Sequence, residues 1–328
     1  MKTQRILLSF TLLFLLVACG TATAEPAITI PVTATSTQVP TEIPAVATTT
    51  ALPLTPDAPS IVEAPTETPT LVPDAWKNMP IIPIVPSRMV DVYRAGLAAG
   101  RDPTHFSKIG DCQNINTYFL DSFDTPKEYR LGTQYTYLQS TIDQFSGSWS
   151  RVSLAVKGGL NVAAALNPLW ADPHQCKAGE TPVACEIRIY NPSIVTVSME
   201  ESWSGDTVHY NMYLRKIVEY ILSQNVVPIL ATRAELPGND KDINATVARI
   251  AYDYQVPLWN FWAATNPLPS HGVYLTDPYG RPDGFHLTQG RYFFTFDDPD
   301  TMKDGWPWRN LTALEAIDAV YHAVSAQK

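Results

Sequence analysis

The sequence predicts an α/β domain built on a parallel sheet. Runs rich in apolar and β-branched residues alternate with segments of helical periodicity over residues 76–328, and several of these runs are apolar almost throughout. Strands that are buried on both faces have this pattern. The predicted strands are residues 106–111, 152–157, 193–199, 226–232 and 256–259, and the predicted helices are residues 208–224, 242–254 and 311–326. Such alternation implies a parallel sheet with helices on both faces.

The start of the chain has the pattern of an export signal. Lys2 and Arg5 precede an apolar run over residues 6–17, which is too short to span a bilayer. The run ends at Ala18-Cys19 and resembles the bacterial lipobox, in which the cysteine becomes the lipidated N-terminus. We therefore predict a lipoprotein signal peptide over residues 1–18, a lipid on Cys19 and an extracytoplasmic, membrane-anchored location in the cell envelope. The alternative is an ordinary secretory signal followed by a chance cysteine.

A segment without folding capacity follows the lipobox. Between Thr21 and Ala75 the chain has 14 Thr and 10 Pro in 55 residues, with no aromatic residue, Lys or Arg. Such a composition buries too little apolar area to offset the entropy of ordering, and proline at this density favours extended chain. Residues 19–75 are thus expected to be a disordered tether, and residues 76–328 the folded domain.

Composition and motifs exclude several classes of function. The net charge of −9 argues against a nucleic-acid partner, which requires a basic face. There is no His-Glu-x-x-His zinc motif, no Gly-x-Ser-x-Gly elbow and no phosphate-binding loop. We therefore expect no metal and no cofactor, and we expect a monomer.

The four cysteines fall into three groups. Cys19 is assigned to the lipid, and Cys176 and Cys185 lie nine residues apart in a stretch rich in loop-forming residues. In an oxidising compartment these two are expected to form a disulfide. Cys112 is then left unpaired, either as a reactive thiol or as a buried and inert one.

Two short motifs carry a family resemblance. Gly110-Asp111-Cys112 follows the first predicted strand, and Asp283 precedes His286 by three residues near the C-terminus. Together they resemble the SGNH, or GDSL-type, hydrolase family. The resemblance implies a three-layer α/β/α sandwich with a flavodoxin-like parallel sheet of about five strands. It also implies Cys112 as the nucleophile in place of the family's serine, His286 as the general base and Asp283 as the residue that orients the histidine.

The same resemblance implies an oxyanion hole. Its donors would be the amide of Cys112, an amide of Gly158 or Gly159 after the second predicted strand, and a side chain after the third. The sequence does not separate the two glycines. The family's Gly-x-Asn-Asp motif is absent, and residues 198–203 stand in its place with Ser202 near the position of the asparagine. A lost oxyanion donor costs ~10²–10³ in rate, and the two glutamates before Ser202 would oppose an oxyanion.

These residues predict an ester hydrolase anchored at the cell surface, acting on an acylated glycan or another small ester. An acyltransferase is a variant, because a thioester can pass its acyl group to an acceptor other than water. The alternative is a degenerate member of the fold that binds carbohydrate without turnover. A solute-binding lipoprotein fits less well, because such proteins usually have two lobes. Trp306 and Trp308 could wall the cleft, although helix packing is the favoured interpretation.

Overall fold

The computed structural model describes residues 71–199, 206–238 and 242–326. The chain divides into two units, Met1–Pro65 and Thr66–Lys328, and all the described residues belong to the second unit. The signal peptide, Cys19, most of the tether and Ser202 lie outside the described residues. The export signal, the lipid on Cys19, the disordered tether and the oxyanion role of Ser202 therefore stay predictions.

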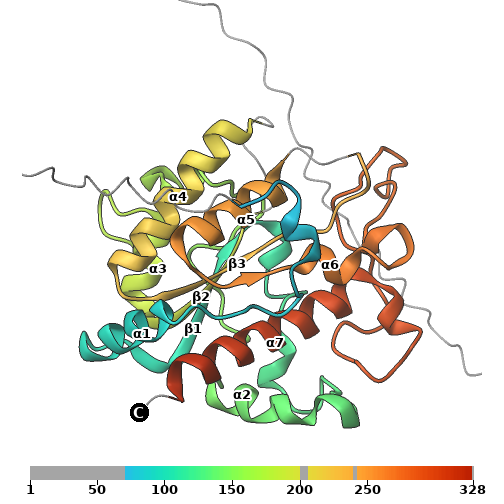
Figure 1. Cartoon of the computed structure of the whole chain (residues 1–328), viewed down its shortest axis with the longest axis horizontal. Coiled ribbons are helices and arrows are strands. Elements are labelled where there is room, and N and C mark those ends of the chain that lie inside the picture. The colour runs from blue at the N-terminus through green and yellow to red at the C-terminus, as the bar shows by residue number, and fades with distance from the viewer. Residues whose placement is uncertain (1–70, 200–205, 239–241, 327–328) are drawn as a thin grey trace, which may run out of the picture. The chain divides into compact units, whose positions relative to one another are not determined.

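A parallel four-stranded sheet forms the centre of the described domain (Figure 1). Its strands lie in the order β1 (Asp102–Gly110), β2 (Pro192–Ser198), β3 (Val227–Ala231) and β4 (Leu258–Trp259). Every residue of β2 and β3 is buried, as the apolar runs predicted. Gly110 pairs with Ser198, so β1 and β2 end at the same level. Because all four strands are parallel, their carboxyl ends form one edge of the sheet.

The prediction of a strand over residues 152–157, the second in chain order, is wrong. This segment makes only an isolated parallel bridge, between Val156 and Gly110. Side chains occupy the backbone groups that a ladder would use, since the Ser153 hydroxyl donates to the carbonyl of Lys108 in β1 at 2.6 Å and the amide of Leu154 donates to Glu186 at 2.8 Å. The segment therefore runs beside β1 without joining the sheet as a strand.

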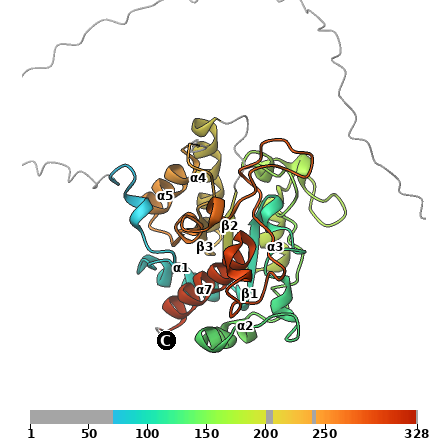
Figure 2. The same ribbon diagram turned by 90° about the vertical axis from the view of Figure 1, so that its right-hand side faces the viewer.

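Helices cover both faces of this sheet (Figures 1 and 2). One face carries α3 (Pro182–Tyr190), α4 (Thr207–Ser223) and α5 (Ile243–Tyr254), whereas the other carries α1 (Arg88–Ala98) and α7 (Gly305–Ser325), with α2 (Gln139–Gln144) beside α7 and the short α6 (Phe261–Thr265) near its start. The result is a mixed α/β domain compatible with three layers. None of the helices in the described ranges is both long and apolar enough to cross a membrane.

The last helix, α7, begins at Gly305 rather than at residue 311 as predicted. Pro307 lies in its first turn, where a missing backbone N–H costs no hydrogen bond. Asn310 is buried within the helix, where its side chain accepts from the amide of Leu120 at 2.9 Å and donates to the carbonyl of Tyr118 at 3.0 Å. The helix therefore holds the chain that follows β1 against the sheet.

The disulfide between Cys176 and Cys185 is confirmed. It joins the loop before α3 to the helix itself, with 5.3 Å between the two Cα atoms. Together with Glu180, these cysteines are the one group of metal-type ligands close together among the described residues, but the disulfide consumes both thiolates and Glu180 pairs with Arg188 at 2.6 Å. The group is thus a structural cross-link.

Removing this cross-link is expected to destabilise the domain. A Cys176→Ala/Cys185→Ala double variant should lose about 2–3 kcal/mol of unfolding free energy, because closing a loop of this size restricts the unfolded chain. Urea unfolding followed by tryptophan fluorescence measures the loss, and wild-type protein treated with reductant should match the double variant. Equal midpoints for the oxidised wild type and the double variant would contradict the expectation.

Candidate functional site

The turn after β1 places Cys112 at the carboxyl edge of the sheet. Asp111 is fully buried and caps a single 3₁₀ turn, Cys112–Asn114, by accepting from the amide of Gln113 at 3.2 Å. Cys112 is half-buried and takes no part in a disulfide. We call residues 110–114 the nucleophile turn.

Gly110 is required by the tightness of this turn. A Cβ atom at that position would lie 2.0 Å from Nδ2 of Asn114 and 2.6 Å from the carbonyl oxygen of Ser198. The Asn114 side chain occupies that space because its Nδ2 donates to the same Ser198 carbonyl at 2.8 Å. The glycine thus lets the turn fold back and attach to the end of β2.

Asp283 and His286 form a hydrogen-bonded pair on one loop. Nδ1 of His286 lies 3.1 Å from each carboxylate oxygen of Asp283, and Oδ1 also accepts from the amides of Phe285 and His286, at 3.1 and 3.0 Å. Gly284 has φ of +78°, which permits the tight turn between them. The Asp283 side chain is 7% exposed and that of His286 60% exposed. A proton on Nδ1 leaves Nε2 as the acceptor, which is the arrangement a general base needs.

One hydrogen bond connects the nucleophile turn to residues 283–286, which we call the histidine loop. Nε2 of Gln113 donates to the carbonyl oxygen of Phe285 at 2.8 Å. Gln113 follows Cys112 and Phe285 precedes His286, so the bond brings the loops that carry these two residues side by side. The predicted nucleophile, base and orienting acid therefore belong to adjoining segments, although Cys112 and His286 are 174 residues apart in the sequence.

The structure distinguishes the two candidate oxyanion glycines. The amide of Lys157 donates to the carbonyl of Gly110 at 3.3 Å, which ties the segment to the nucleophile turn. A Cβ at Gly158 would lie 3.8 Å from Cδ1 of Ile115, whereas one at Gly159 would meet no atom within 4 Å. Within the described ranges, neither the amide of Gly158 nor that of Gly159 donates to a protein acceptor, so the contact with Ile115 is what separates the two. Gly158 is the better donor candidate, and Gly159, with φ of +75°, is required by the turn.

The remaining predicted residues contribute less. Ser202 and the two glutamates before it lie outside the described residues. Trp306 is 5% exposed and packs against Tyr118 and Phe293, with ring centroids 5.4 and 6.1 Å apart. Trp308 is partly buried against the core and donates to the carbonyl of Met302 at 2.7 Å. Both tryptophans are packing residues, as the favoured interpretation predicted.

Arg309 is the residue of this site that the sequence argument missed. It lies in α7 and is fully buried, with its guanidinium carbon 4.8–5.4 Å from the ring centroids of Phe119, Trp259 and Phe261. Nε donates to the carbonyl of Gln113 at 3.0 Å, and Nη2 donates to the hydroxyl of Ser198 at 2.8 Å. Arg309 thus fastens the nucleophile turn to the end of β2. The sequence did hold one signal for a buried charge: Arg309 adjoins the apolar helical segment predicted over residues 311–326.

A second buried cation lies beneath the site, in β1. Lys108 is 1% exposed, and its Nζ donates to the carbonyl of Trp149 at 2.9 Å and to Oδ1 of Asn116 at 3.1 Å. Burial lowers the pKa of Lys108 to about 7, against the favourable fields of Asp121 and Glu186. The lysine joins the chain after the nucleophile turn to the loop before residue 150.

No family model matches this sequence, and no curated protein matches it either. The function is therefore inferred from the geometry of the site.

Lys108 should make stability depend on pH. Its pKa is about 7 in the folded state and near the ordinary 10.5 in the unfolded chain, so between these values the unfolded chain binds more protons and stability rises with pH. Below about pH 7 both states are protonated and this contribution no longer changes. Urea unfolding at about pH 7 and about pH 9.5 should show a rise that is smaller in Lys108→Met. An identical rise in the variant would remove Lys108 as its source.

Proposed function

We propose that this protein is a surface-anchored ester hydrolase of the SGNH type with a cysteine nucleophile. The observation that carries the proposal is the Gln113–Phe285 hydrogen bond at 2.8 Å, which joins the turn of Cys112 to the loop of the Asp283–His286 pair. A nucleophile, a base and an orienting carboxylate on adjoining segments are the components that nucleophilic acyl transfer requires.

The topology supports the same class. Gly110 pairs with Ser198 on one side and bridges Val156, so residues 152–157 run along the outer edge of β1. Counting that segment as the second position gives the spatial order 2-1-3-4-5, the flavodoxin-like order. Ligands of such sheets bind beyond the carboxyl ends of the strands. The nucleophile turn follows the carboxyl end of β1.

In the proposed reaction, Nε2 of His286 takes the thiol proton of Cys112 and the sulfur attacks the ester carbonyl. Asp283 holds the Nδ1 proton and stabilises the imidazolium. The amides of Cys112 and Gly158 donate to the developing oxyanion. Collapse of the tetrahedral species breaks the carbon–oxygen bond, and the alcohol leaves with the proton from His286. Water, activated by His286, then attacks the thioester, which releases the acid and restores the thiol.

The acceptor in the second half-reaction decides between hydrolysis and acyl transfer. His286 is largely exposed, so water has access to the thioester. A sugar hydroxyl bound in place of that water would give the acyltransferase variant. Both variants use the same three residues and the same thioester.

A second candidate function is carbohydrate binding without turnover. The cysteine in place of serine and the absence of the Gly-x-Asn-Asp motif favour it, because both changes remove parts that an oxygen-ester hydrolase uses. It predicts an unreactive Cys112 and no ester turnover by any variant.

The catalytic proposal predicts a reactive thiol. Iodoacetamide at neutral pH should alkylate Cys112 and abolish hydrolysis of p-nitrophenyl acetate, because His286 favours the thiolate. His286→Ala should lower kcat/KM by at least ~10³-fold, since nucleophile and base act as a unit. Cys112→Ser should retain or raise activity in a site shaped for oxygen and should impair it in one adapted to sulfur.

His322→Ala is the matched control for that experiment. His322 is 57% exposed and lies 3.3 Å from Asp318 in α7, so it repeats the exposure and carboxylate pairing of His286 outside the nucleophile turn and the histidine loop. It should leave kcat/KM unchanged. Absence of turnover in the wild type, together with a thiol that resists alkylation in the native state, would favour the binding function.

The anchor is a separate part of the proposal. The apolar run ending at Ala18-Cys19 supports lipidation of Cys19. Cells expressing the wild type should incorporate labelled palmitate into the protein, and Cys19→Ala should abolish both the label and membrane association. Cys112→Ala serves as the control that removes a different cysteine outside the disulfide. A wild type without label would remove the anchor and leave the hydrolase proposal standing.

A further inference from the structure

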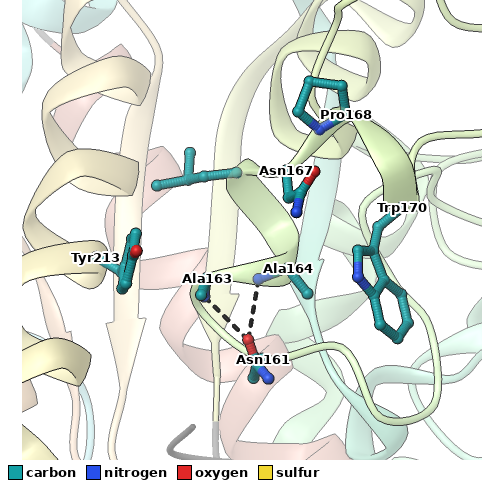
Figure 3. A pocket seen from close by; sticks show the side chains of 8 residues that line it. Asn161, Ala163, Ala164, Asn167, Pro168, Trp170 and Tyr213 are labelled. Carbon is teal, nitrogen blue, oxygen red and sulfur yellow. Dashed lines mark hydrogen bonds between the residues drawn. The ribbon is translucent and has the colours of Figure 1, made fainter. Parts of the chain in front are cut away.

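A hollow lined by none of the residues assigned so far lies beside α4 (Figure 3). It has a volume of about 560 Å³ and is lined by Tyr213 of α4 and by seven residues of the segment 161–170, namely Asn161, Ala163, Ala164, Leu166, Asn167, Pro168 and Trp170. This volume is in the range of small-ligand sites. The lining segment follows Gly159 directly along the chain, so the loop that carries the candidate oxyanion glycine continues into the wall of the hollow.

Trp170 is the exposed tryptophan of the described chain, at 40%, and the adjoining Leu169 is 90% exposed. The backbone that carries the ring is held in a defined conformation. Residues Pro168–Trp170 form a 3₁₀ turn that starts with proline, and Asn167 caps it by accepting from the amide of Leu169 at 3.0 Å. Nζ of Lys157 lies 5.3 Å from the centroid of the Trp170 ring. An aromatic ring is thus held in a fixed place at the surface, where it contributes little to the core.

Two carboxamides stand with Trp170 around the hollow (Figure 3). Oδ1 of Asn161 accepts from the amides of Ala163 and Ala164 at 3.1 and 2.9 Å, and Oδ1 of Asn167 holds the cap already described. Each oxygen is committed to the backbone, so each Nδ2 is the group that can donate to a ligand. Tyr213 faces them from α4 across the hollow.

This chemistry fits a sugar ring better than the other common ligands. A saccharide presents C–H faces that pack on an aromatic ring and hydroxyls that accept from amide N–H groups. The lining residues themselves carry no charge, and the nearby ammonium of Lys157 lies against the Trp170 ring, so the polar groups that the lining offers are neutral carboxamides and a phenol. An acyl chain would prefer the more apolar hollow of about 570 Å³ that includes Met79, Ile84 and Val256.

We propose that the hollow binds a saccharide unit of a glycan, with Trp170 as the stacking platform and Asn161 and Asn167 as hydroxyl-binding donors. The proposal goes beyond the ester chemistry and does not depend on Cys112. With an active Cys112 site, the hollow would hold the glycan whose acyl group is removed. Without an active Cys112 site, saccharide binding in the hollow would be the whole function of the domain.

The test is isothermal titration of the full chain with chitotetraose, cellotetraose, xylotetraose and maltotetraose. At least one should bind, and Trp170→Ala should weaken that binding at least tenfold. Asn161→Asp keeps the oxygen that caps residues 163 and 164 but replaces the Nδ2 donor, so it should weaken binding several-fold without a loss of fold. Tyr137→Ala is the control, because Tyr137 is an exposed aromatic, at 54%, that bonds to Glu315 of α7 instead.

Circular dichroism should give the same spectrum and melting temperature for all four proteins, since the replaced side chains are not core residues. Binding that survives in Cys112→Ala and is lost in Trp170→Ala supports the saccharide site even where no ester is hydrolysed. Ester hydrolysis that is unchanged in Trp170→Ala, with no oligosaccharide bound by the wild type, overturns the saccharide site and leaves the hydrolase proposal intact. Equal affinity of the wild type and Trp170→Ala also overturns it.

Discussion

The buried guanidinium of Arg309 is the constraint on which the arrangement of the site depends. A full charge inside a protein is costly unless it is hydrogen-bonded and packed, and Arg309 meets this cost with carbonyl and hydroxyl acceptors and with three aromatic faces. Its acceptors belong to the nucleophile turn and to β2, and the arginine itself belongs to the last helix. Three segments that are far apart in the sequence are therefore fixed to one another, and the histidine loop joins them through Gln113.

A second polar network fixes the segment that runs beside β1. Glu186 of α3 is fully buried, receives Arg151 in a two-point ion pair, and also accepts from the hydroxyl of Ser107 and the amide of Leu154. Through these bonds a helix on one face of the sheet determines the path of residues 151–158. The path of the chain toward Gly158 thus follows from a carboxylate of the neighbouring helix, which bonds directly to Arg151 and Leu154, rather than from strand pairing. Loss of either network would leave buried charge without partners, which is far more costly than the loss of an exposed pair.

Most of the fold followed from the sequence because its signals are local. The apolar runs of β2 and β3 and the periodicity of α4 and α5 depend on burial on fixed faces, which a pattern of residues expresses directly. The failure at residues 152–157 has the opposite origin, because Ser153 and Glu186 compete for the ladder groups and no pattern of apolar residues records that competition. Likewise Asp283 and His286 could be paired by their spacing, whereas Gln113, Arg309 and Trp170 act through contacts made only in the folded chain.

The interrupted edge of β1 has a consequence for how molecules behave when crowded together. A regular edge strand offers unpaired N–H and C=O groups to the edge of a neighbouring molecule and so invites aggregation. Here the Ser153 hydroxyl donates to the Lys108 carbonyl, and the irregular segment of residues 152–157 runs along the edge formed by β1. The opposite edge is a strand of only two residues, Leu258–Trp259. Within the described residues, neither side of the sheet therefore presents a long regular strand edge with which a second copy could pair.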